Sequence, residues 1–271
     1  MRRVTILAAM IVLVALAAVV ATAGEWKTID DDDWCDDGSW NSDRDTYCEV
    51  REITIPADRD VIRVDGEANG GIEVEGWDKD EIRIRIKVKA WARNDDDARE
   101  MAEAIEVDVD GRVIHAEGPK QRRKNGWGVS YKIMVPKESN LELEATNGGI
   151  AVFDVEGEIY LDTTNGGLHI GNLAGDVRGR TTNGGLHVEL SGKTWRGKGL
   201  DVRSTNGGVD LEIPKKYNAE LETGTVNGGI HLDFPVTVQG KIGKSIKATL
   251  GDGGPRVRVK TTNGGVHVSH T

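Results

Sequence analysis

The chain has 271 residues, of which 35 are Lys or Arg and 45 are Asp or Glu, and its formal net charge at pH 7 is −10. An acidic surface repels the phosphates of nucleic acids and the head groups of anionic lipids, so we expect neither as a partner. Aromatic residues make up only 5% of the chain while glycines number 35, a composition that favours short strands and turns over helices.

Residues 1–23 have the order of a secretory signal peptide. Arg2 and Arg3 precede an apolar run over residues 6–20, and small residues at Ala21 and Ala23 fit cleavage after Ala23. A retained membrane anchor is the alternative, but the apolar run is short for a membrane span. We therefore expect an exported protein, periplasmic, secreted or at the cell surface, with no membrane span after cleavage.

Residues 24–51 form an acidic leader that contains both cysteines of the chain, Cys35 and Cys48. Disulfides persist in exported proteins, so we expect the two to form a bridge, with a reduced pair as the alternative. The consecutive aspartates at 30–33 lack the alternating ligand spacing and the glycine of a calcium loop, and they indicate a solvated charge run.

Residues 52–137 are predicted to form an antiparallel β region with one short helix. Residues 82–88 alternate between apolar and basic, which is typical of a strand with one buried face. Asn94 is a helix-capping residue followed by three aspartates, and Asp110-Gly111 between two alternating segments indicates a hairpin. A further strand is expected over residues 129–135, before Pro136.

Residues 138–271 are dominated by a repeat. Asn-Gly-Gly followed by an apolar residue occurs seven times, at Asn69, Asn147, Asn165, Asn183, Asn206, Asn227 and Asn263. A repeat of about 20 residues is one supersecondary unit that stacks on the next. When the Asn is counted as position zero, positions −6, −4, −2, +3 and +5 are mostly apolar or small and face inward. The Asn-Gly-Gly is therefore the predicted corner between two strands.

Two topologies fit this pattern: a series of antiparallel hairpins or a β-solenoid. We favour an all-β, repeat-built β-solenoid, a parallel β-helix-like stack with about 18–23 residues per coil. Stacking explains why the same residue types recur at the same offset, and it lets the corner asparagines bond to one another along the stack.

Three motifs carry a family resemblance: Thr-Thr-Asn-Gly-Gly-Leu-His, Gly-Trp-Asp-Lys-Asp at 76–80 and Gly-Asp-Gly-Gly at 251–254. They resemble the bacterial putative-adhesin family, also called the toastrack or β-strand-repeat family, domain of unknown function 4097. The resemblance covers about residues 50–271. It implies an exported all-β repeat domain of the cell envelope, discussed with adhesion and envelope stress, and it brings no settled catalytic residue.

Position +4 of the repeat is the first candidate site, because it carries His169, His187, Asp210, His231 and His267. In a solenoid His169 and His187 lie on adjacent coils, with Asp210 and His231 next along the same face. Imidazoles about 5 Å apart beside a carboxylate can bind zinc, nickel or copper. The alternative is an exposed polar position that was duplicated with its repeat. Protonated imidazoles would also repel one another, which suggests a response to acid.

Two cationic loops are the second candidate, with Trp195, Arg196 and Lys198 in one and Arg122, Arg123 and Trp127 in the other. A protruding Trp beside cations can contact a sugar or an acidic partner. The alternative for Trp195 is a lid that folds back over its coil.

We expect a non-enzymatic binding or scaffolding protein of adhesin-like type, without a cofactor, whose partner is an envelope or extracellular protein or glycan. The alternatives are a polysaccharide-acting enzyme on a β-helical scaffold and a metal- or pH-responsive envelope sensor component. The chain ends just after the Asn263 repeat. This predicts an uncapped C-terminal coil that is able to self-associate.

Overall fold

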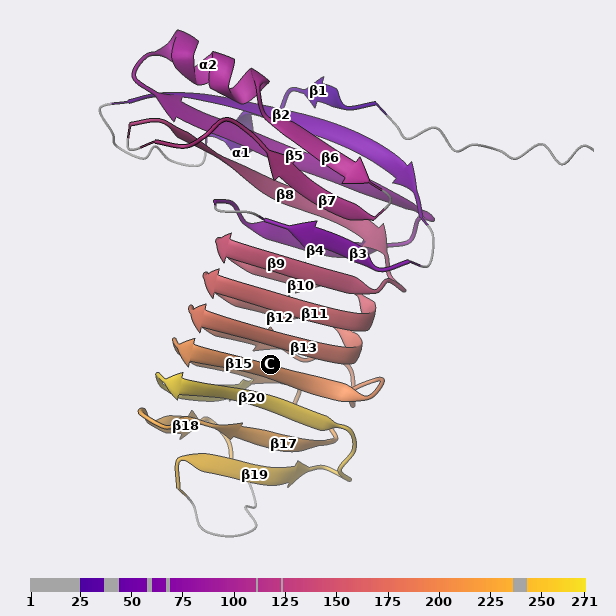
Figure 1. The fold of residues 1–271 in the computed structure, drawn as a ribbon. Helices are drawn as coiled ribbons and strands as arrows, with labels where there is room; N and C mark the ends of the chain where they lie inside the picture. Colours follow the sequence, from indigo (N-terminus) through magenta and orange to yellow (C-terminus); the bar gives the residue numbers. More distant parts are fainter. Residues whose placement is uncertain are drawn as a thin grey trace, which may run out of the picture.

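The computed structural model describes residues 25–36, 44–57, 60–66, 69–110, 112–122, 124–235 and 243–271. The predicted signal peptide lies outside these residues. The described strands form two sheets that face each other along an elongated stack (Figure 1). We call the eleven-stranded sheet, which runs from β1 to β18, sheet A, and the ten-stranded sheet, which runs from β19 to β6, sheet B.

Each central coil contributes one strand to each sheet, with the Asn-Gly-Gly at the corner between them. The sheet B strands are β9 (Leu141–Asn147), β11 (Glu156–Asn165), β13 (Ala174–Asn183) and β15 (Gly199–Asn206). The sheet A strands are β10 (Ile150–Phe153), β12 (Leu168–Gly171), β14 (Leu186–Glu189) and β16 (Val209–Ile213). Neighbouring strands are parallel, and their register pairs each corner Asn with the next one. The predicted β-solenoid is confirmed over the hairpin alternative.

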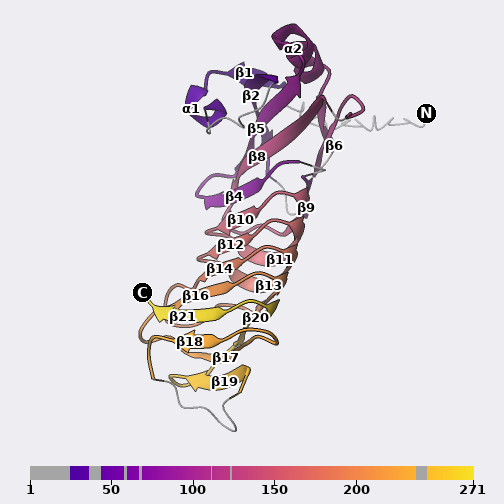
Figure 2. The same ribbon diagram turned by 90° about the vertical axis from the view of Figure 1, so that its left-hand side faces the viewer.

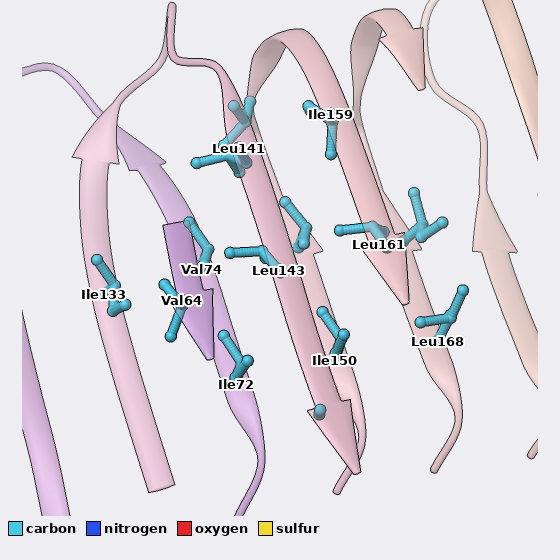
Figure 3. Close-up of a cluster of buried hydrophobic side chains, with 14 of the residues drawn as sticks. Val64, Ile72, Val74, Ile133, Leu141, Leu143, Ile150, Ile159, Leu161 and Leu168 are labelled. Atoms are coloured by element: carbon cyan, nitrogen blue, oxygen red, sulfur yellow. The ribbon is translucent and has the colours of Figure 1, made fainter. Parts of the chain in front are cut away.

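The core lies between the two sheets, which Figure 2 shows on opposite sides of the stack. Leu143 and Leu161 from sheet B point towards Ile150 and Leu168 from sheet A, and all four are at most 1% exposed (Figure 3). Full burial of a side chain of this size contributes roughly 1.5–3 kcal/mol. Because the same offset is apolar in successive copies, stacking forms continuous apolar rows, and this holds the coils together.

The corners are held by polar contacts between successive copies. The corner asparagines stack in the order Asn147, Asn165, Asn183, Asn206, Asn263 and Asn227. From Asn165 onward, each side-chain amide donates to the side-chain oxygen of the preceding Asn in the stack at 2.7–2.9 Å. At position −2 the hydroxyls of Thr163 and Thr181 donate to glycine carbonyls of the preceding copy, at 2.8 and 2.7 Å. The predicted asparagine ladder is confirmed.

The last copy in the chain is not the last coil of the stack. Its strands, β20 (Arg256–Asn263) and β21 (Val266–His270), lie between the Asn206 coil and the Asn227 coil, whose strands are β17 (Ala219–Gly224) and β18 (Ile230–Leu232). In sheet B an antiparallel strand, β19 (Ser245–Leu250), follows β17. The expectation of an uncapped C-terminal coil was wrong, and the case for self-association through that coil loses its basis.

Charge at one outward position favours this order of coils. Arg258 of β20 pairs in register with Asp201 of β15 on one side and with Glu222 of β17 on the other. Direct stacking of β17 on β15 would instead bring two strands with acidic outward residues together, and like charges opposite each other are destabilising. At this position the insertion of β20 gives alternating signs across the three strands, and Lys260, which stands opposite Arg203 in register, pairs with Glu222 at 2.6 Å.

The predicted antiparallel region contains one further coil of the stack. Strands β3 (Ile62–Asp65) and β4 (Ile72–Trp77) flank the Asn69 corner and pair in parallel with β9 and β10. After this coil the chain forms β5 (Glu81–Ala92), α2 (Asp95–Glu103), β6 (Glu106–Asp110), β7 (Val113–Glu117) and β8 (Gly126–Pro136). Strand β5 is antiparallel to β8 and to β2 (Asp45–Pro56), as expected, and β6 and β7 form the predicted hairpin.

Helix α2 is the helix expected after Asn94, whose side chain accepts a hydrogen bond from the Asp97 amide at 2.8 Å. Its Ala98 and Ala102 are fully buried, and Ala102 is part of the hydrophobic core. Arg51 of β2 donates to the carbonyls of Ile105 and Ala102 and so satisfies the C-terminal end of the helix. Neither described helix, of four and nine residues, has the length and apolar character needed to cross a bilayer.

Candidate functional site

The outward residues at position +4, together with Lys132 of β8, form a continuous line across sheet A, which we call the outer row. In register order it consists of Lys132, Glu73, Ala151, His169, His187, Asp210, His267 and His231. The prediction that His169 and His187 lie on adjacent strands is confirmed. The expected order at the far end was wrong: His267 follows Asp210, and His231 comes after it, because the C-terminal copy is inserted there.

The first cluster of the outer row is formed by His169, His187 and Glu189. The Nε2 atoms of His169 and His187 lie 3.2 and 2.9 Å from the same oxygen of Glu189. The two rings meet edge-on with centroids 4.5 Å apart, and Phe153 packs edge-on against His169 at 4.7 Å. Hydrogen bonds with His169 and His187 hold the pKa of the Glu189 carboxyl below its usual value.

A second cluster has the same composition at the other end of the row. The Nε2 atoms of His231 and His267 each lie 2.9 Å from an oxygen of Asp233. Their rings are stacked with centroids 5.5 Å apart. The hydrogen bond with Asp233 raises the pKa of the His267 imidazole.

Asp210 lies between the two clusters. One of its oxygens is 3.6 Å from Nδ1 of His187, and the other is 3.4 Å from Nδ1 of His267. The same carboxylate therefore faces the inner nitrogen of one histidine in each cluster, while the Nε2 atoms point towards Glu189 and Asp233.

The carboxylates at position +6 were missed by the sequence analysis. Glu189, Glu212 and Asp233 each stand two residues after a member of the outer row. Alternation along a strand places positions +4 and +6 on the same face, so this spacing was the available signal. The prediction from the sequence rested on position +4 alone, because the histidines repeat there.

An open groove of about 880 Å³ runs along the outer row, from β8 to β21. Its lining includes the second glycine of successive corners, at Gly71, Gly149, Gly167, Gly185 and Gly208. Because glycine has no side chain, these positions leave a strip of backbone beside the imidazoles and carboxylates.

The leader contributes to one end of the groove through Trp34, which belongs to the short helix α1 (Asp32–Cys35). Lys132 lies 4.6 Å from the centre of the Trp34 ring, and Lys87 donates to the Trp34 carbonyl at 3.1 Å. Asp31 forms an ion pair with Arg85 of β5. The expected disulfide between Cys35 and Cys48 is present and connects α1 to β2. The leader therefore covers the outer face of β5 and β8.

Trp195 folds back over its own coil as a lid and does not protrude into solvent. It is 4% exposed, and its indole nitrogen donates to the Gly175 carbonyl at 3.0 Å. Arg196 pairs with Glu156 at 3.4 Å and Lys198 with Glu158 at 3.3 Å. The loop closes over its own coil, and its cations are paired with carboxylates of the stack.

The tryptophan of the second candidate loop, Trp127, is not exposed to solvent either. Trp127 is 8% exposed in β8, and its indole nitrogen donates to the Pro119 carbonyl at 2.8 Å. Arg122 is exposed and forms a backbone bridge with Asn125, whereas Arg123 lies outside the described residues. A large ring buried in the core contributes more apolar contact than an exposed one, which is why both predicted sugar-stacking tryptophans are internal.

Among solved structures, a putative cell adhesion protein from Clostridium sporogenes ATCC 15579 is similar, with 10% identity, a TM-score of 0.42, and coverage of 82% of this chain and 100% of that chain. A putative adhesin from Parabacteroides distasonis ATCC 8503 has 12% identity, a TM-score of 0.34, and coverage of 80% and 96%. A putative lipid binding protein from the same organism has 12% identity, a TM-score of 0.33, and coverage of 83% and 96%. No curated protein sequence matches the chain.

The sequence profile of the family described as Toastrack DUF4097 matches residues 51–269. This range takes in the antiparallel region, the Asn69 coil and the Asn-Gly-Gly copies that follow it. The match covers most of the chain and agrees with the resemblance in its motifs. The chain belongs to the toastrack family DUF4097.

Proposed function

We propose that the protein is an exported, non-enzymatic binding protein of adhesin-like type whose ligand lies along the groove on sheet A. The observation that carries this proposal is the outer row, a line of side chains, all polar except Ala151, at regular intervals beside a strip of glycine backbone. Export is supported by the order of residues 1–23 and by the disulfide of the leader.

The groove favours a linear glycan over a peptide strand. Its lining crosses seven strands, which corresponds to about 29 Å at the usual strand spacing. Those strands are paired with their neighbours, so a peptide laid across them has no free sheet edge to extend. Sugar hydroxyls can instead bond to imidazoles and carboxylates at repeated intervals, and successive weak contacts add along the row.

The enzyme alternative has less physical support. Hydrolysis of a glycosidic bond needs a carboxylic acid that stays protonated near neutral pH, which requires a raised pKa. The pKa of Glu189 is lowered by its two histidine partners. A carboxylate in this state accepts hydrogen bonds from a ligand but does not donate a proton to it.

Binding of the mature chain to an array of linear polysaccharides, measured in EDTA, tests the proposal. We expect binding that falls at least tenfold in a His169→Ala and His187→Ala double variant. His115→Gln is the matched control, because His115 also lies near a glutamate, Glu117 at 3.7 Å, but on β7 of sheet B. Glycan binding that the double variant retains would contradict the site. If the mature chain bound an extracellular protein and the double variant did not, the groove would be assigned to a protein ligand.

A further inference from the structure

We propose that the outer row holds two binding sites for a divalent transition-metal ion. One site consists of His169, His187 and Glu189, and the other of His231, His267 and Asp233. In each site two imidazole nitrogens and a carboxylate oxygen converge, with all ligand atoms within 4.8 Å of one another. This inference is independent of the nature of any ligand that lies in the groove.

Two of the three ligand separations in the first site are close to those that a tetrahedral ion requires, and all three are within 4.8 Å. Zinc–nitrogen and zinc–oxygen bonds of about 2.0–2.1 Å imply ligand atoms about 3.3 Å apart along each edge of the tetrahedron. The Nε2 atoms of His169 and His187 lie 3.2 and 2.9 Å from the Glu189 oxygen. Small side-chain rotations would therefore admit an ion among the three atoms. Glu212 is farther from His187, at 4.0 Å, which makes Glu189 the nearer ligand.

The second site uses the two oxygens of one carboxylate. Each oxygen of Asp233 lies 2.9 Å from the Nε2 of a different histidine, His231 or His267. The stacked rings stand on neighbouring strands, β18 and β21, whose register is fixed by the sheet. Its residues are exposed whereas those of the first site are half-buried, and the largest difference is in the histidines, with the His231 side chain 75% exposed against 34% for His187. We expect the second site to be the weaker one.

Asp210 orients a ligand in both sites. Histidines that bind a metal through one nitrogen commonly direct the other towards a carboxylate, which sets the tautomer and the ring orientation. Asp210 faces the Nδ1 atoms of His187 and His267 at 3.6 and 3.4 Å. This leaves the Nε2 atom of each ring as the metal ligand.

The donor set selects the class of ion. Two imidazoles with one carboxylate suit zinc, copper and nickel, whereas calcium and magnesium prefer all-oxygen sites. Three protein ligands leave a fourth tetrahedral position for water or for a group of a bound molecule. The first site opens into the groove, since His169 and His187 line it.

Isothermal titration of the metal-free mature chain with Zn²⁺ tests both sites, without any other ligand. We expect two ions per chain, falling to one in His187→Gln and to one in His231→Gln, while His115→Gln still binds two. Asp210→Asn should weaken both sites by about 10–100-fold, the usual effect of removing such an orienting carboxylate. Co²⁺ binding reports the geometry of the first site. We expect absorption bands typical of tetrahedral Co²⁺, and we expect His187→Gln to lose them.

Thermal melting in EDTA establishes that each variant is folded before titration. No Zn²⁺ binding below millimolar concentration would overturn the proposal. Full retention of Zn²⁺ binding in a combined His187→Gln and His231→Gln variant would also overturn it. Loss of one Zn²⁺ ion in His231→Gln with unchanged glycan binding in EDTA would separate the metal sites from the proposed function, because His231 does not line the groove.

Discussion

At the scale of single residues, the two glycines of each corner have different roles. A Cβ atom added at Gly207 would lie 2.0 Å from the Gly184 carbonyl oxygen of the preceding coil. A Cβ added at Gly208 would lie 3.6 Å from the Gly265 oxygen, an ordinary contact. The first glycine is therefore required by the close approach of the coils. Steric contact alone does not require the second at this position, where it instead leaves the groove open.

Gly207→Ala should lower the free energy of unfolding by about 1–3 kcal/mol or more, because the methyl group forces two coils apart. Gly208→Ala is the matched control one residue away, and we expect a change of less than about 1 kcal/mol there. Chemical denaturation of the two variants measures the difference. Equal losses in both would contradict the role assigned to the first glycine.

At the scale of single elements, the contact between β20 and β17 depends on one buried carboxylate, Glu222. This side chain is 8% exposed and accepts hydrogen bonds from Lys260 at 2.6 Å and Arg258 at 3.0 Å. Burial by itself raises the pKa of the Glu222 carboxyl. Its hydrogen bonds with Lys260 and Arg258 outweigh burial and lower the pKa from 4.5 to about 2.

A carboxyl whose pKa is lower in the folded state stabilises the fold above its unfolded pKa and loses this effect in acid. The contribution of Glu222, about 3 kcal/mol, should be present above about pH 5 and disappear as the pH falls from 4.5 towards 2. We expect Glu222→Gln to be less stable at pH 7 by this amount and to change less between pH 5 and 2. Denaturation curves across this range measure both effects.

Glu158→Gln is the control for Glu222, because Glu158 is exposed and pairs with the exposed Lys198 at 3.3 Å. An exposed pair of this kind contributes about 0–1 kcal/mol. If the Glu222 and Glu158 variants had the same pH dependence, the buried pair would not be the cause.

The leader is the second element whose attachment can be tested. The disulfide closes a segment with a sequence separation of 13, and a loop of about this size contributes about 3 kcal/mol of local stability. A Cys35→Ser and Cys48→Ser double variant should release α1 from the outer face of β5 and β8. We expect faster proteolytic cleavage between residues 30 and 44 and an altered Trp34 environment, with the repeat stack still folded. Unchanged cleavage would show that Trp34 and Asp31 hold the leader without the bridge.

Neighbour contacts govern stability at the scale of the whole molecule, as in other stacked repeats. The inserted C-terminal coil contacts the Asn206 coil on one side and the Asn227 coil on the other. Removing residues 256–271 would leave β17 to face β15, with acidic residues on both strands. We expect β17, β18 and β19 to lose protection from amide hydrogen exchange while the coils from Asn147 to Asn183 keep theirs.

Removal of residues 25–44, at the opposite end of the stack, is the control for the C-terminal deletion. Because β17 and β19 contact no leader residue through their pairings, their exchange protection should stay unchanged. Protection of β17 to β19 that survives the C-terminal deletion would contradict the bridging role of β20 and β21.

The repeat determined much of this protein by sequence alone: the solenoid, its corners, the inward positions and the residues of the outer row. These features depend on short-range periodicity, which each copy carries in its own residues, as the Asn165 and Asn183 copies illustrate. The α2 cap at Asn94 and the hairpin around residues 110–111 are local in the same sense.

Only the tertiary structure decided which copies touch. Every copy has the same corner, so the period cannot distinguish the Asn263 coil from the Asn227 coil as the neighbour of Asn206. That choice depends on outward charges, Asp201 with Arg258 and Arg258 with Glu222, which meet only after folding. The docking of Trp34 beside Lys132 and the closure of Trp195 over Gly175 belong to the same category. Each is a contact between segments far apart in the chain, and local pattern carries no information about such partners.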